Sequence, residues 1–233
     1  MPYKRRYRKR RKYKRRRGKR NMVRVPRAMI TPNGIKKFKL TDQFTAITSP
    51  AGFFEGTFNL HSMSQAYNSN STTTPLAVSA VGNITGLFDF YKVTGIKIEY
   101  LPNYKDPQQS LSVLSSNGEF GPNPNFLCAT DNDNVGSLTT NDMYEKDSLK
   151  IKSPFRRWRT WIKPMQMIQG LDASGVGIPQ HGWLNLQREL NMTVGIHTIR
   201  SDQRFTDDTN NVLASLPIGQ FLVSYYVSVK TRN

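Results

Sequence analysis

The sequence predicts an all-β fold: a single eight-stranded antiparallel jelly roll with a disordered Arg/Lys-rich N-terminal arm. Short runs of alternating apolar and polar residues recur after residue 34, and turn-forming residues separate them. No stretch has the period of a confident amphipathic helix, so alternating βαβ units are not expected. Eight strands in two sheets is the number that a jelly roll requires. Charge separates the arm from the rest, so we expect a basic arm and tether at 1–34 and the folded domain at 35–233.

Nine ranges show strand-like alternation, the one at 192–199 least clearly, and about eight strands are expected. In chain order they are 36–47, 53–60, 88–101, 126–130, 148–152, 158–163, 183–188, 192–199 and 221–230. The Ser/Asn/Thr-rich stretch 62–74 is predicted as a long loop, as are 103–125 and 131–147. The Ala/Val segment 76–81 fits a short helix or a strand, and the pattern does not decide between them.

The range 88–101 has the strongest strand pattern. Val93 breaks phase with Ile96 and Ile98 across Gly95, which predicts a bulge or bend at the glycine. The C-terminal run is also strong, since alternation places on one face Phe221, Val223, Tyr225, Val227 and Val229.

The positive charge is concentrated at the N-terminus. Residues 1–40 hold 19 of the 34 Lys and Arg and no Asp or Glu. Residues 41–233 hold the other 15 cations and all 16 acidic residues, a net charge of −1. The net charge of +18 therefore belongs to the arm.

The arm is expected to be disordered alone and to bind a polyanion. Lys and Arg fill 14 of the 17 positions from 4 to 20, so like charges repel and no core can form. Displaced counterions favour binding to nucleic acid without base recognition, and tyrosines add stacking on unpaired bases. The predicted nucleic-acid-binding residues are Lys4, Arg5, Arg6, Tyr7, Arg8, Lys9, Arg10, Arg11, Lys12, Tyr13, Lys14, Arg15, Arg16, Arg17, Lys19, Arg20, Arg24 and Arg27. Such a run also fits a nuclear localisation signal.

Several other classes of protein are not expected. No run of 18 uncharged apolar residues occurs, so membrane insertion is not predicted, and no apolar segment of a secretory signal follows the N-terminal charges. The single Cys128 allows no intramolecular disulfide. His61, His181 and His197 lie in separate segments without ligand spacing, so no zinc site is expected.

No constellation indicates an enzyme, a cofactor or a metal site. There is no P-loop and no nucleophile-elbow sequence. The segment 131–142 resembles a calcium-binding loop, with Asp131, Asp133 and Gly136 at its first, third and sixth positions. Its fifth position, however, is Val135, which offers no side-chain oxygen, and its twelfth is Asp142 rather than Glu. A polar turn-rich loop is the better interpretation.

The basic cluster at 156–159 leaves two interpretations open. Alternation places Arg157 and Arg159 on one face of a strand and Trp158 on the other. The arginines then either touch nucleic acid from an inner surface or lie at an interface, with their stems on apolar surface.

Several segments together resemble the capsid protein of circoviruses and related small circular single-stranded DNA viruses, as a divergent member. They are MPYKRRYRKRRKYKRRR at the start, FDFYKVTGIKIEYLP, GWLNLQ and the terminal FLVSYYVSVK. The resemblance implies a jelly roll that self-assembles into a small icosahedral T=1 shell of sixty subunits, with the arm inside around single-stranded DNA. It also implies nuclear import by host machinery through the arm, presence in the virion and, during assembly, in the host nucleus. Attachment to a host-cell factor such as a sulfated glycan is implied too.

The charge arithmetic agrees with that scheme. Sixty copies of residues 1–40 would bring about 1,140 positive charges, enough for on the order of a thousand phosphates. The alternative is a cellular nucleic-acid-binding protein of ribosomal or chromatin-associated type with a basic extension. That alternative predicts a basic patch on the folded domain, which a net charge of −1 does not supply. A capsid that packages RNA is a variant of the leading hypothesis.

Overall fold

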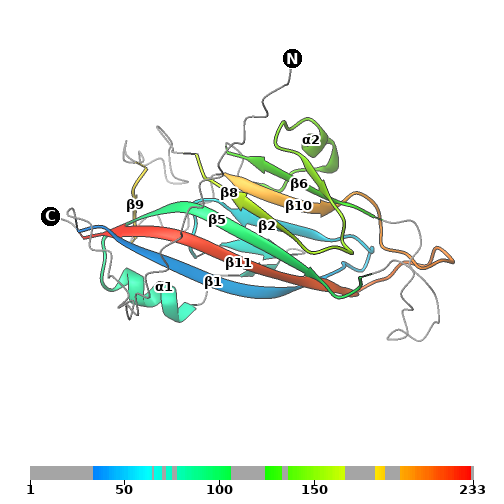
Figure 1. Ribbon diagram of the computed structural model, residues 1–233, viewed down its shortest axis with the longest axis horizontal. Helices are drawn as coiled ribbons and strands as arrows, with labels where there is room; N and C mark the ends of the chain where they lie inside the picture. Colours follow the sequence, from blue (N-terminus) through cyan, green and yellow to red (C-terminus); the bar gives the residue numbers. More distant parts are fainter. Residues whose placement is uncertain are drawn as a thin grey trace, which may run out of the picture.

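Two antiparallel β-sheets form the fold in the computed structural model (Figure 1). It describes residues 34–64, 66–69, 72–74, 78–105, 124–132, 136–165, 182–186 and 195–231. Sheet A has the strand order β1 (Lys36–Ile47), β11 (Pro217–Lys230), β5 (Phe90–Pro102) and β8 (Trp158–Ile162), and β5 also pairs with the short β9 (Leu184–Asn185). Sheet B has the order β4 (Thr72–Thr74), β3 (Tyr67–Ser69), β2 (Glu55–Asn59), β10 (Ile196–Ser201), β6 (Phe126–Asp131) and β7 (Lys150–Lys152).

The connections between the sheets make this a jelly roll. Eight main strands divide into the four-strand paths β1–β11–β5–β8 and β2–β10–β6–β7. Along these eight strands the chain passes from one sheet to the other at every connection except β6 to β7. The first strand, β1, pairs with the last, β11. Long-range antiparallel pairing of this kind confirms the predicted fold class. Figure 1 shows β1, β11 and β5 side by side along the length of the molecule.

Some local predictions need correction. The predicted loop at 62–74 contains β3 and β4, because polar β-branched residues such as Thr72–Thr74 are well suited to an edge strand. The undecided segment at 76–81 contributes to α1 (Val78–Thr85). A second helix, α2 (Thr140–Tyr144), interrupts the predicted loop at 131–147. At 183–188 only the two residues of β9 pair in the described part of the chain.

The bulge predicted in β5 is confirmed. Tyr226 pairs with Gly95 and Val227 pairs with Val93, so Thr94 is the extra residue on the β5 side. The Thr94 hydroxyl donates a hydrogen bond of 2.9 Å to the carbonyl oxygen of Tyr226. The shift lets apolar side chains on both sides of the bulge point into the core.

Aromatic rings from both sheets meet at the centre of the core. Phe221 on β11 is fully buried, and its ring centroid lies 5.0–6.4 Å from those of Phe44, Phe54, Phe58, Tyr100, Phe126 and Trp158. The buried Tyr225 hydroxyl donates to the carbonyl oxygens of Asn59 and Ala66, which ties sheet A to the segment around β2. The predicted inward face of β11 is therefore confirmed.

The outer faces of the two sheets differ. On sheet B, Leu127, Ala129 and Ile196 form a second apolar cluster with Leu138 and Met143, so the α2 segment covers part of that face. On sheet A, the described outward side chains are exposed or half-buried, apart from two serines on β11. Sheet A therefore presents an accessible outer surface. None of the described helices is long and apolar enough to span a bilayer.

Candidate nucleic-acid interface

The predicted arm lies outside the described residues, and with it every predicted nucleic-acid-binding residue from Lys4 to Arg27. The described chain starts at Gly34, at the beginning of the edge strand β1. Lys37 and Lys39 follow on the outward side of that strand, so the basic composition of the arm continues onto sheet A.

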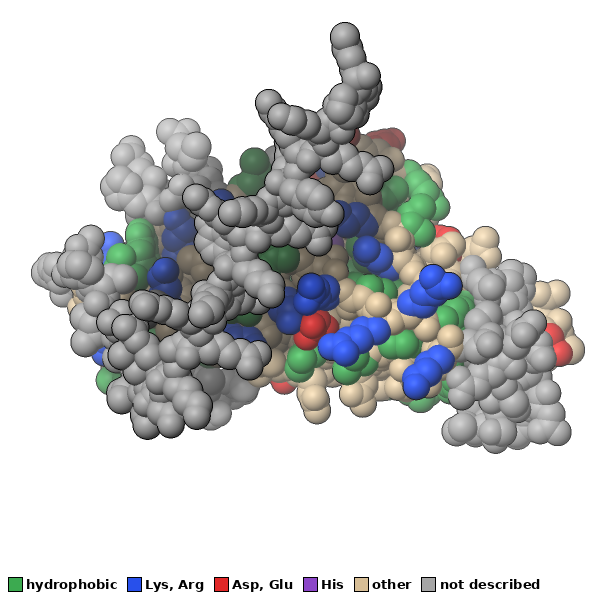
Figure 2. All heavy atoms as spheres, viewed as in Figure 1, with side chains coloured by type: hydrophobic (Ala, Val, Ile, Leu, Met, Phe, Trp, Pro, Cys, Tyr) green, Lys and Arg blue, Asp and Glu red, His purple; other side chains and the backbone are tan. Residues whose placement is uncertain are grey.

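The outward positions of sheet A form what we call the basic face. Strand register brings eight cations to it from four strands and their ends, against a single carboxylate, that of Glu99. The cations are Lys37, Lys39, Lys92, Lys97, Arg157, Arg159, Lys163 and Lys230. Figure 2 shows Lys and Arg side chains gathered on the face where these strands lie, with hydrophobic side chains between them and little acidic surface. Such a surface attracts polyanions.

Glu99 does not cancel the positive charge of the basic face. Its carboxylate accepts a 2.9 Å contact from Lys97 Nζ and lies 3.9 Å from an Arg157 nitrogen. The hydrogen bond from Lys97, and then the nearby positive charges, hold the pKa of Glu99 below its usual range. Among the residues that the structure describes, Arg159 and Lys163 make no ion pair. Arg159 is the cross-strand neighbour of Glu99 and helps to lower its pKa, but neither cation is held within ion-pair distance of a described carboxylate.

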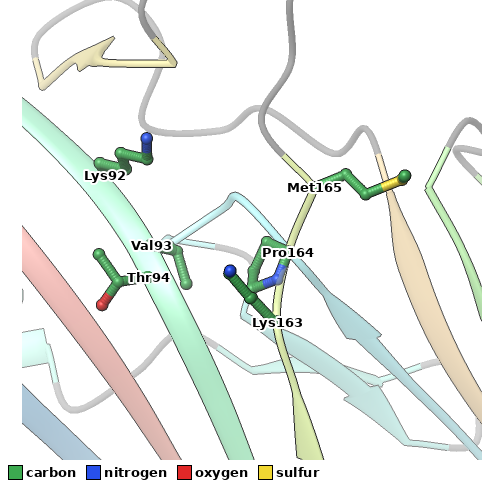
Figure 3. Close-up of a pocket in the computed structure, with 6 residues that line it drawn as sticks. All are labelled: Lys92, Val93, Thr94, Lys163, Pro164 and Met165. Atoms are coloured by element: carbon green, nitrogen blue, oxygen red, sulfur yellow. The ribbon is translucent and has the colours of Figure 1, made fainter.

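Two lysines flank a pocket at the edge of the basic face. The pocket has a volume of about 540 Å³, and its lining residues come from β5 and from the end of β8. Figure 3 shows Lys92 projecting from β5 and Lys163 from the end of β8, on the two sides of this opening. Partial burial lowers the pKa of Lys92. A phosphate at this position would gain from both ammonium groups.

Aromatic side chains lie among the cations. Trp161 on β8 is 54% exposed, and its ring centroid is 4.9 Å from that of Tyr226 on β11. Lys97, Arg159 and Thr160 complete a neighbouring pocket of about 550 Å³ that these two rings line. At the far end of the sheet, Lys230 Nζ lies 4.8 Å from the ring centroid of Trp183.

Carboxylates gather around α2, where Lys146, Lys150 and Lys152 partly offset their charge. Asp142, Glu145 and Asp147 are exposed around α2, and Asp131 lies nearby on β6. Asp131 pairs with Lys146 at 2.6 Å. Acidic residues therefore gather away from the basic face.

The calcium-like pattern has structural roles in the described residues. Asp142 forms a capping box with Thr139: each side chain accepts a hydrogen bond from the other residue's backbone N–H. Asp131 is held by its ion pair, and Asp133 lies outside the described residues. Within the described ranges no group of three or more potential metal ligands occurs.

The two described histidines are packing residues. Burial lowers the pKa of His61 to about 4 and that of His197 to about 3, so both are neutral near pH 7. His197 Nδ1 lies 2.8 Å from Thr130 Oγ1. Burial raises the pKa of the Cys128 thiol to about 12, which suppresses its thiolate chemistry. His181 lies outside the described residues.

The alternation predicted around Arg157, Trp158 and Arg159 is confirmed: both arginines are exposed and the tryptophan is buried. Sequence reasoning missed that Lys97 and Tyr226 join them across the sheet, because that depends on strand order. It also took the net charge of −1 to mean that the domain has no basic patch. That inference was wrong, since acidic residues gather around α2 and in loops. A basic patch therefore does not distinguish a capsid protein from a cellular binding module.

Comparison with known proteins identifies the relatives of this chain. The family model described as "Circovirus capsid protein" matches residues 3–232. A search of curated proteins gave no significant match. Among solved structures, a chain of Cocksfoot mottle virus is 12% identical, with a TM-score of 0.50, covering 85% of this chain and 96% of that one. A chain of Mud crab tombus-like virus is 9% identical, with a TM-score of 0.50, covering 87% of this chain and 92% of that one. A chain of Cucumber Necrosis Virus is 14% identical, with a TM-score of 0.51, covering 87% of this chain and 53% of that one. These distant structures share the fold.

Proposed function

Because the chain belongs to the circovirus capsid protein family, we propose that it assembles into a T=1 shell of sixty subunits and packages circular single-stranded DNA. Membership of the family makes it a capsid protein and a component of the virion. The size of the shell and the nature of its cargo are parts of the proposal. The observation that carries it is the separation of charge between the arm, the basic face and the rest of the domain.

The arm supplies most of the positive charge for the genome. Its predicted cations and tyrosines, from Lys4 to Arg27, bind phosphates and unpaired bases without reading a sequence. Sixty arms would neutralise on the order of a thousand phosphates. Before assembly the same arm acts as a nuclear localisation signal that brings the protein to the host nucleus.

The basic face points towards the genome in this proposal. Two observations support that orientation. The arm joins the domain at Gly34, beside the strand that carries Lys37 and Lys39. The carboxylates around α2 pack on the side of sheet B, away from the basic face, where they would not repel DNA.

The remaining surface suits contact between copies of the chain. Residues 41–233 as a whole carry a net charge of only −1, so whole domains can approach each other without strong net repulsion. The segments 62–75, 103–125 and 131–147, of which the first contains β3 and β4 and the last contains α2, are proposed to lie at subunit contacts and on the outside. An attachment factor on the host cell, such as a sulfated glycan, is proposed to bind the outer surface apart from the carboxylates around α2.

The test compares the full chain with a variant that lacks residues 1–34. Both are expressed, purified and imaged by electron microscopy, and the absorbance ratio at 260 and 280 nm reports packaged nucleic acid. We expect both to form shells, with nucleic acid only in those of the full chain. DNase and RNase treatment of the released cargo identifies it. Unassembled full chain under all salt conditions would contradict the shell, and an unchanged nucleic-acid content in the truncated shells would contradict the role of the arm.

A further inference from the structure

Trp161 occupies an unusual place on the basic face. A Cβ atom on Gly95 would lie 2.4 Å from Trp161 Cζ2, so the six-membered part of the indole rests against the glycine backbone. The glycine is part of the bulge in β5 and pairs with Tyr226 on the next strand. The indole therefore reaches from β8 over β5 to the Tyr226 ring, and it is still 54% exposed.

Cations surround these two rings. Lys97 is the cross-strand neighbour of Trp161, and Arg159 lines the same pocket. Arg159, Trp161 and Lys163 alternate along β8 and its end, so a cation stands on each side of the indole at a spacing of about 7 Å. Neither of these cations has an ion pair among the described residues.

A single-stranded nucleic acid is the occupant that fits this chemistry. Its unpaired bases stack on an exposed aromatic ring while its phosphates meet the flanking cations. A duplex offers the phosphates but keeps its bases stacked inside, so it gains nothing from the indole. An apolar partner protein, by contrast, would have to bury the two unpaired cations, which is unfavourable.

We propose that Trp161, supported by Gly95 and Tyr226, stacks an unpaired base of the packaged strand, and that Arg159 and Lys163 hold the neighbouring phosphates. The folded domain then favours single strands over duplexes, while the arm binds both. This inference rests on the proposed function, because it assumes that the basic face meets the genome.

The experiment measures affinity of the full chain, purified free of nucleic acid, for a twenty-nucleotide oligothymidine and for a twenty-base-pair duplex at several salt concentrations. The test variant is Trp161→Leu and the conservative variant is Trp161→Tyr. Tyr144→Leu is the matched control, because Tyr144 is similarly exposed, at 55%, but lies on α2.

We expect Trp161→Leu to weaken single-strand binding by about 5- to 150-fold, to leave duplex binding unchanged and to keep the salt dependence of wild type. Trp161→Tyr should retain most of the affinity, and Tyr144→Leu should bind like wild type. The double variant Arg159→Gln, Lys163→Gln should weaken binding to both nucleic acids and reduce the salt slope for single strands by about 1.4. Oligothymidine should also quench tryptophan fluorescence in wild type more than in Trp161→Leu.

A second variant guards against misfolding of the first. Gly95→Ala keeps the indole but places a methyl group where it rests, so it should reproduce the single-strand defect while circular dichroism stays native. Unchanged single-strand affinity in both variants would overturn the inference, as would an equal loss for single strands and duplexes. Loss of shells with normal affinity would instead make Trp161 a subunit contact and also overturn it. In each of these cases wild-type shells that contain DNA would leave the proposed function standing.

Discussion

Replacing Phe221 with alanine should be among the most damaging single changes to this fold. Phe221 is fully buried, and six aromatic rings drawn from both sheets and the segment between β1 and β2 surround it within 6.4 Å. Those rings are held by different strands and cannot all move inwards to fill the space. We therefore expect a loss in the middle of the range for Phe→Ala, about 4 kcal/mol.

Urea denaturation of the unassembled protein, followed by circular dichroism, measures this loss. With a slope of about 2 kcal/mol per molar urea, the midpoint should fall by about 2 M and the slope should stay unchanged. Leu222→Ala is the matched control, because Leu222 is the next residue of β11 but points outwards and is half-buried. It should cost less than about 1 kcal/mol. A similar loss for both variants, or a loss below about 1 kcal/mol for Phe221→Ala, would refute the reasoning that this ring joins the two sheets.

Three further predictions concern buried polar groups and close contacts. Burial holds the pKa values of His61 and His197 below 6.5, so below that pH the unfolded chain binds more protons than the folded chain. The free energy of unfolding should therefore fall as the pH is lowered from about 6.5 to 4, by up to about 1.4 kcal/mol per pH unit for each histidine. Substitution of a histidine with Gln should flatten this dependence in urea denaturation measured at several pH values. A profile that rises as the pH falls would contradict this. Tyr225→Phe removes the donor of the buried Asn59 carbonyl oxygen, whereas the Ala66 oxygen still accepts the Asn59 N–H at 2.9 Å. It should therefore cost about 1–3 kcal/mol in the same urea assay; no change would show that water replaces the hydroxyl. Gly219→Ala places a Cβ atom 2.6 Å from a backbone oxygen and should lower Tm, whereas Gly82→Ala in α1 has open space and should raise it; the reverse order would contradict the packing.

Much of the fold was predictable because local alternation determines it. The period of two in 88–101 and 221–230 identified the two central strands of sheet A, and the phase break at Gly95 located the bulge. The inward side of β11 followed from the same alternation, since its apolar residues stand at every second position.

Other features depend on contacts that local patterns do not contain. The two-residue β9 exists because it pairs with the start of β5, and α2 is one short turn stabilised by its capping box and by Met143. Polar strands such as β4 resemble loops in composition, because an edge strand needs few apolar residues.

The candidate site was predictable only in part. The arm remains a prediction from charge, and alternation placed Arg157 and Arg159 together, as the structure confirms. Local alternation could not predict that these arginines lie beside Lys97, Trp161 and Tyr226. That grouping depends on the strand order β11–β5–β8, which brings residues from distant parts of the chain to one surface. Net charge was a poor guide because it sums over faces that point in different directions.

The most direct test of the central idea, that cations are placed to face the genome, is ultraviolet cross-linking of intact purified particles followed by mass spectrometry of the peptide–nucleotide adducts. The proposal predicts adducts in the arm, at tyrosines such as Tyr7 and Tyr13, and on the basic face around Trp161 and Tyr226. Adducts concentrated on the α2 segment, around Tyr144, with none in the arm or on the basic face, would contradict it.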